Sequence, residues 1–168
     1  MELLIPGLIL VALMVWASTK IKKTAADAFE AESIEAENYS LQKPEGFLHV
    51  LVDSEHELYA YSREYGEGSS SKLRRATIEI DILKSASLAQ VRDEIKNAPD
   101  VEIVREIPAE SELETDESAN ESSIRAFYKI VGTQNEIYRL RFAVLSAHLD
   151  EYLDRVRDTL DSFSIRSN

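Results

Sequence analysis

Four basic side chains near the C-terminal end of the chain have types and spacing suited to binding an anion. They lie in two stretches of alternating polarity joined by residues 132–136, a pattern typical of a β-hairpin. If the loop has three or five residues, Lys129 lies opposite Arg139 on one side of the sheet. The sequence therefore predicts one basic face, composed of Arg125, Lys129, Arg139 and Arg141.

This basic face has two interpretations. Like charges opposite each other in a sheet cost from a few tenths to about 1 kcal/mol per pair unless an anionic group lies against them. In the first interpretation, the acidic loop or stalk of the same chain supplies that group. In the second, an anionic partner or ligand docks on the face.

The histidines do not form a recognised metal motif. His56 could bind a metal with Asp53 and with Glu55 or Glu57, but this spacing matches no zinc pattern. We therefore expect His56 and the nearby His49 to be loop residues, and we predict no metal.

Residues 109–121 are rich in acid and contain no basic residue. A tight calcium loop needs a glycine turn and alternating Asp or Asn ligands, and this segment has neither. We expect an exposed acidic loop, with weak cation binding as the alternative. The carboxylates concerned are those of Glu110, Glu112, Glu114, Asp116, Glu117 and Glu121.

Composition argues against several other functions. The chain of 168 residues has a net charge of −12, and the residues after position 23 carry −14, so it is repelled by nucleic acid. It has no cysteine, which excludes disulfides, thiol catalysis and thiolate metal sites. No nucleophile elbow and no phosphate-binding glycine loop occurs. We predict a protein that is not an enzyme and has no cofactor.

The first 23 residues resemble a membrane anchor. Residues 3–19 are uncharged and largely apolar, and these 17 residues span roughly 26 Å as a helix against a hydrocarbon core of about 30 Å. The aromatic and basic residues at the end of the segment suit the interface with water. The anchor is represented by Leu3, Leu10, Trp16, Lys20, Lys22 and Lys23.

The charge around this segment predicts its orientation. No Lys or Arg precedes the apolar run and three lysines follow it, which favours an uncleaved anchor with the domain in the cytoplasm. An anchor of the opposite sense, or a signal cleaved after Ala17, would place the domain in the periplasm or outside the cell. We expect a single-pass membrane protein that binds the lipid bilayer.

Periodicity predicts the remaining organisation. Residues 24–37 read as a polar helical stalk, and residues 38–168 as one α+β domain with a mostly antiparallel sheet flanked by helices. The clearest signals are the alternating strand 75–83, a helix with a capping box at Ser87 and Gln90, and a last helix that Ser146 can cap. Further strands are expected over 38–44, 57–65, 101–107, 123–131 and 137–145.

Two stretches of the domain resemble a known family. ENYSLQKPEGF (37–47) is similar to the strand and turn that open PsbP-like domains, and YRLRFAVLSAHLDEYLDRVRDTLDSFSI (138–165) to their closing strand and helix. The resemblance implies an α/β/α sandwich that serves as a binding or assembly module. Members usually lie outside the cytoplasm, whereas this chain lacks a lipid-attachment cysteine and carries lysines that favour the inner face.

Together these observations predict a membrane-tethered, non-enzymatic binding or scaffolding module that presents an acidic α+β domain to a protein partner. An extracytoplasmic domain of the same fold that binds a small ligand or ion is the alternative. A hydrolase is the third possibility.

Overall fold

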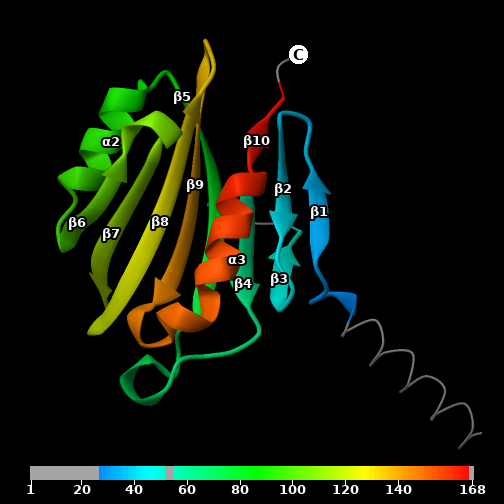
Figure 1. Cartoon of the computed structure of the whole chain (residues 1–168), viewed down its shortest axis with the longest axis vertical. Coiled ribbons are helices and arrows are strands. Elements are labelled where there is room, and N and C mark those ends of the chain that lie inside the picture. The colour runs from blue at the N-terminus through cyan, green and yellow to red at the C-terminus, as the bar shows by residue number, and fades with distance from the viewer. Residues whose placement is uncertain (1–26, 52–54, 167–168) are drawn as a thin grey trace, which may run out of the picture.

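The computed structural model describes residues 27–51 and 55–166, which form two antiparallel sheets and two α-helices (Figure 1). The larger sheet contains, in spatial order, β3 (Phe47–Val50), β4 (Leu58–Ser62), β5 (Ala76–Lys84), β9 (Glu136–Leu145), β8 (Ser122–Gly132), β7 (Glu112–Ala119) and β6 (Val101–Ile107). The smaller sheet contains β1 (Glu32–Glu35), β2 (Tyr39–Lys43) and β10 (Ser164–Ile165). The helices are α2 (Leu88–Lys96) and α3 (Leu149–Ser162), and short 3-10 turns are η1 (Gly68–Ser70), η2 (Pro108–Glu110) and η3 (Ser146–His148).

Local sequence patterns explain most of these elements. In β5, Ala76, Ile78 and Ile80 are buried on one face, as the alternation predicts. The predicted hairpin is confirmed as β8 and β9. The predicted capping box opens α2: Gln90 N–H donates to Ser87 Oγ, and Ser87 N–H donates to Gln90 Oε1.

The two helices pack on opposite faces of the larger sheet. One core cluster joins α3 to the face that carries Ile80 and Leu140. A second cluster joins α2 to the other face through Val91 and Ile130. Figure 1 shows α3 in front of the sheet. This arrangement confirms the predicted α+β class with an antiparallel sheet flanked by helices.

The acidic segment 109–121 is not the exposed loop that its composition suggested. Most of it forms β7, which is hydrogen-bonded between β6 and β8, and both Leu113 and Thr115 are buried. Basic side chains of β8 and β9 lie against its carboxylates. The repulsion that favours a loop is therefore relieved by partners that are distant in the sequence.

The polar segment before the domain also differs from its prediction. A helical stalk was expected over 24–37, but Glu32–Glu35 pair with β2 as strand β1. Before that strand, Phe29 O accepts a hydrogen bond from Gly46 N–H. The folded domain therefore begins before residue 38, and the helical prediction is wrong for β1.

Two further expectations concern the ends of helices. Ser146 does not cap α3, because it begins η3, and His148 occupies the cap position without a side-chain capping bond. The anchor predicted over residues 1–23 lies outside the described residues. Within the described part of the chain, no helix is both long enough and apolar enough to cross a membrane.

Candidate docking groove beside the last helix

The β8–β9 ladder separates the four basic residues that were predicted to share a face. Arg139 lies opposite Ile130, and Lys129 lies opposite Leu140. Residues opposite each other point to the same side, so Arg125 and Lys129 lie on the α3 face, and Arg139 and Arg141 lie on the α2 face. The prediction of one basic face is wrong, because a shift of one residue moves a whole strand's side chains to the opposite side.

Carboxylates of the same domain pair with the arginines on both faces. On the α3 face, Arg125 Nη1 donates to Glu114 Oε1 at 2.5 Å, and its Nε donates to Asp116 Oδ1 at 2.7 Å. On the α2 face, Arg139 Nη2 donates to Asp81 Oδ2 at 2.8 Å. The acid that covers these side chains is therefore internal: the acidic segment supplies it for Arg125, as the first interpretation expected, whereas strand β5 supplies it for Arg139.

Arg141 is the centre of the most extensive of these networks. Its Nη1 donates to Glu79 Oε2 at 3.0 Å, its Nη2 to Glu117 Oε2 at 2.6 Å, and its Nε to the Tyr128 hydroxyl at 3.1 Å. Burial works against the charge of Arg141, but Glu79 and Glu117 hold its pKa above the ordinary value. Burial also opposes the ionisation of Glu117, yet Arg141 and Tyr128 keep the pKa of this carboxyl below its usual value.

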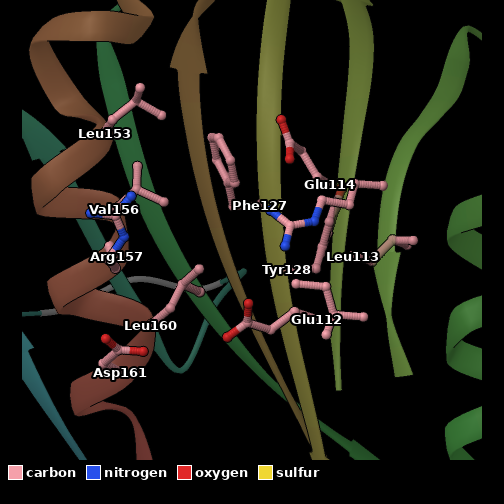
Figure 2. Close-up of a pocket in the computed structure, with 12 residues that line it drawn as sticks. Glu112, Leu113, Glu114, Phe127, Tyr128, Leu153, Val156, Arg157, Leu160 and Asp161 are labelled. Carbon is pink, nitrogen blue, oxygen red and sulfur yellow. The ribbon is translucent and has the colours of Figure 1, made fainter. Parts of the chain in front are cut away.

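A groove of about 200 Å³ lies between α3 and the strands β6, β7 and β8 on the α3 face (Figure 2). It exists because α3 packs on β2, β8 and β9, and no helix of the described chain covers β6 and β7 on this side. Figure 2 shows Leu153, Val156 and Leu160 pointing from α3 toward the sheet, where Phe127 points toward the helix. Leu153 remains 37 % exposed although it belongs to the apolar stripe of α3.

Charged residues surround this apolar strip. They are Arg105, Glu112, Glu114, Arg157 and Asp161. Arg105, Glu112 and Asp161 make no side-chain hydrogen bond or ion pair with any residue that the structure describes. Burial is the main reason that the pKa of Glu112 is raised above its ordinary value; Glu110 and Asp161 add to the rise, and Lys129 and Arg105 act against it.

Two other hollows are larger, and each contains polar groups that are paired with one another. One of about 390 Å³ lies over the α2 face, where Glu79 and Arg141 form an ion pair. The other, of about 410 Å³, is rich in serine, and Ser70 Oγ lies 2.7 Å from Ser122 Oγ. We take the groove beside α3 as the candidate site, because it combines exposed apolar surface with charged side chains that form no close ion pair among the described residues.

The histidines lie in separate places, and His49 belongs to strand β3 rather than to the expected loop. His56 Nδ1 is 2.8 Å from Asp81 Oδ1, and His148 Nδ1 is 3.0 Å from Glu151 Oε1. No group of three or more His, Asp or Glu side chains that could hold a metal ion occurs among the residues 27–51 and 55–166. Asp53, which the sequence offered as a ligand beside His56, lies outside the described residues.

Sequence reasoning identified part of this groove. The apolar stripe of the last helix, predicted from its spacing, includes Leu153 and Val156. That Leu153 stays exposed depends on where α3 crosses the sheet, which no local pattern encodes. Arg105, Phe127 and Asp161 carried no signal, since single charged or aromatic residues are common in strands and helices.

Solved structures of other proteins share this fold. LpqN of Mycobacterium tuberculosis, involved in cell envelope biogenesis, is 12% identical with a TM-score of 0.57, over 82% of this chain and 91% of its own. Cyanobacterial PsbP (CyanoP) from Synechocystis sp. PCC 6803 is 12% identical with a TM-score of 0.55, over 82% and 94%. The Ran-binding protein Mog1p of Saccharomyces cerevisiae is 11% identical with a TM-score of 0.53, over 82% and 96%.

These likenesses establish the fold and nothing finer. The domain has the Mog1/PsbP-like fold, which confirms the resemblance seen at the two ends of its sequence. No protein-family model and no curated protein matches the chain.

Proposed function

We propose that this chain is a membrane-tethered, non-enzymatic binding or scaffolding module whose groove beside α3 receives a segment of a protein partner. The observation that carries the proposal is the exposed Leu153, which lies in one groove with charged side chains of both signs. A central apolar contact surrounded by polar groups is the usual composition of a protein interface. A partner segment with one apolar side chain and charges of both signs would match it.

The tether in this proposal is the segment 1–23. The apolar run would cross the bilayer, and the lysines that follow it would keep the domain in the cytoplasm. The net charge of −12 disfavours nucleic acid as the partner. Among the solved structures of the same fold, the yeast protein is described as Ran-binding, which supports a protein partner by analogy of fold.

An extracytoplasmic domain that binds a small ligand is the second candidate. The observation in its favour is the hollow of about 390 Å³ over the α2 face, lined in part by Tyr59, Thr77 and Arg74. Aromatic and polar groups around a concave surface are typical of ligand sites. A ligand bound there should be insensitive to changes in the groove beside α3.

The groove can be tested with one charged substitution and a matched control. Leu153→Glu places a charge in the groove, whereas Leu88→Glu changes a leucine of similar exposure, 38 %, at the start of α2. Partners of the tagged full chain are recovered from detergent-solubilised membranes and quantified by mass spectrometry. We expect L153E to lower recovery of the main partner by about tenfold or more, and L88E to leave it unchanged. Equal recovery of the partner with both variants would refute the proposal that the partner binds in the groove.

The tether and its orientation require separate measurements. Mass spectrometry of the purified protein should find an N-terminus at or next to Met1, and a chain beginning at Ser18 would contradict the anchor. Because the chain has no cysteine, Gln134→Cys in the exposed β8–β9 loop gives a single label site. A membrane-impermeant maleimide should label it only after the cells are lysed, and labelling of intact cells would favour the extracytoplasmic candidate.

A further inference from the structure

Strand β6 is a free edge of the larger sheet. It is last in the strand order, and with seven residues it is longer than β3, the opposite edge, which has four. Its five central residues are all exposed. An edge strand presents backbone N–H and C=O groups that can pair with a further strand.

A β-bulge in β6 determines which of its side chains share a face. Glu102 lies opposite Asp116, Arg105 lies opposite Glu114, and Val104 has no partner on β7 between them. Asp116 and Glu114 are two residues apart on a regular strand, so they point to the same face. Glu102 and Arg105 therefore both lie on the α3 face, although they are three residues apart.

The side chains around the bulge can match the same side chains of a second copy in charge and polarity. Ile103 and Val104 are 37 % and 44 % exposed, which is unusual for large apolar side chains next to each other on a strand edge. Glu102 and Arg105 make no side-chain hydrogen bond or ion pair with a described residue. One acid and one base without a close ion pair, and two exposed apolar side chains, thus lie along the same edge.

We infer that β6 pairs with β6 of a second copy of this chain in an antiparallel ladder with two-fold symmetry. In this ladder, Ile103 lies opposite Val104 of the second copy, and Glu102 lies opposite Arg105. The symmetry repeats each contact, so two ion pairs flank a central apolar cluster. The neighbouring register that the bulge also permits places Glu102 opposite Ile107 and forms no charge pair.

The direction of the backbone groups agrees with this register. Ser118 N–H donates to Asp100 O at 3.2 Å, just before β6 begins. Hydrogen-bonded pairs alternate along an antiparallel ladder, so Glu102 directs its backbone groups toward β7, and Val101 directs its own toward the free edge. Glu102 of one copy and Arg105 of the other then form a pair that exchanges no backbone hydrogen bonds. In pairs of this kind, the opposite side chains lie closest to each other.

Such a dimer is compatible with two tethers in one membrane. The two-fold axis of an antiparallel strand pair runs perpendicular to the sheet. The described part of each copy begins at Asp27, and the symmetry places the two Asp27 residues at the same height along this axis. Both copies can therefore be attached to a membrane that lies parallel to the sheet.

Charge exchange tests the inference directly. The full chain in detergent micelles is studied by analytical ultracentrifugation as wild type, Glu102→Arg, Arg105→Glu and the double variant. Each single change places like charges opposite each other and should raise the dimer dissociation constant by about tenfold or more. The double variant restores opposite charges and should return the constant to that of the wild type. Glu45→Arg, an equal charge change in the exposed turn before β3, is the control and should have no effect.

Cysteine cross-linking tests the register. The chain has no cysteine, so Glu102→Cys and Arg105→Cys can be prepared separately and mixed in one membrane. An oxidant should produce a disulfide-linked dimer in the mixture and little of it in either variant alone. A wild type that stays monomeric at every concentration would overturn the inference. Failure of the double charge variant to recover the dimer, or equal cross-linking without mixing, would do so as well.

Discussion

Lys129 Nζ donates a hydrogen bond to the backbone carbonyl oxygen of Leu160, 2.7 Å away, and so joins β8 to the last turn of α3. The Leu160 oxygen also accepts a hydrogen bond from Phe163 N–H at 3.3 Å, and the helix dipole favours a cation at this end. The contact fixes the end of α3 that borders the groove, next to Asp161. A basic residue that appeared suited to an external anion thus has a partner inside the domain.

Replacing Lys129 by Met should loosen this end of the helix. Loss of a charged hydrogen bond to a part-buried carbonyl should lower the free energy of unfolding by about 1–2 kcal/mol. Hydrogen exchange should become faster in the last turn of α3 and not in α2. Lys84→Met, which alters a lysine that is 79% exposed, is the control. Equal stability of the two variants would show that the contact contributes nothing.

Lys43 should be required to hold β1 on the domain. Its side chain is 1 % exposed, and Nζ donates to the carbonyl oxygens of Ala28, Glu30 and Phe47 at 3.2, 2.6 and 2.7 Å. Burial lowers the pKa of Lys43, but three carbonyl oxygens satisfy its three donors. Lys43→Met leaves those oxygens unpaired and should cost about 2 kcal/mol, with faster hydrogen exchange in β1. The exposed Lys72→Met should leave the exchange of β1 unchanged.

Arg141 should be the basic residue whose loss is most damaging. Arg141→Met would leave Glu79 and Glu117 partly buried without their cation, at a cost of about 3 kcal/mol in unfolding experiments at neutral pH. Because the pKa of Glu117 is lowered in the folded state, this stabilisation is present above a pH of about 4.3 and is lost as the pH falls. The difference between wild type and variant should therefore shrink in acid. Arg157→Met, at a position 71 % exposed, should show neither effect.

Glu112 should show the opposite dependence on pH. Its pKa is raised in the folded state, chiefly by burial, so its negative charge destabilises the domain at neutral pH. Glu112→Gln should raise the melting temperature at pH 7, and the gain should disappear below a pH of about 4, where both side chains are neutral. Glu110→Gln, which alters an exposed carboxylate, should give a smaller gain. A gain that persists in acid would assign the effect to packing rather than to charge.

The sequence by itself determined the elements whose signals are local. The alternation of β5 follows from a strand with one buried face, and the capping box of α2 needs only Ser87 and Gln90. The apolar stripe of α3 was equally readable, as was the hairpin of β8 and β9. Each of these patterns lies in one continuous stretch of the sequence, so a local window contains it.

That residues 112–119 form a strand rather than a loop depends on residues far away in the sequence. The carboxylates of this segment repel one another locally, which favours a solvated loop when only the segment is considered. Arg125 of the adjacent strand β8 neutralises Asp116, and Arg141 of β9, one strand further away, neutralises Glu117, so that an acidic stretch becomes a strand inside the sheet. The sequence contains both sets of charges but not the pairing between them.

The faces of the basic residues were decided by the tertiary structure alone. Thr133 accepts hydrogen bonds from Asn135 N–H and Glu136 N–H through its Oγ1, and the last β8–β9 pair is Gly132 with Ile137. That turn places Arg139 opposite Ile130 rather than opposite Lys129. Side chains alternate with a period of two, so a register shift of one residue reverses every face of a strand. The groove arises in the same way, because the position of α3 on the sheet is set by packing over the whole domain.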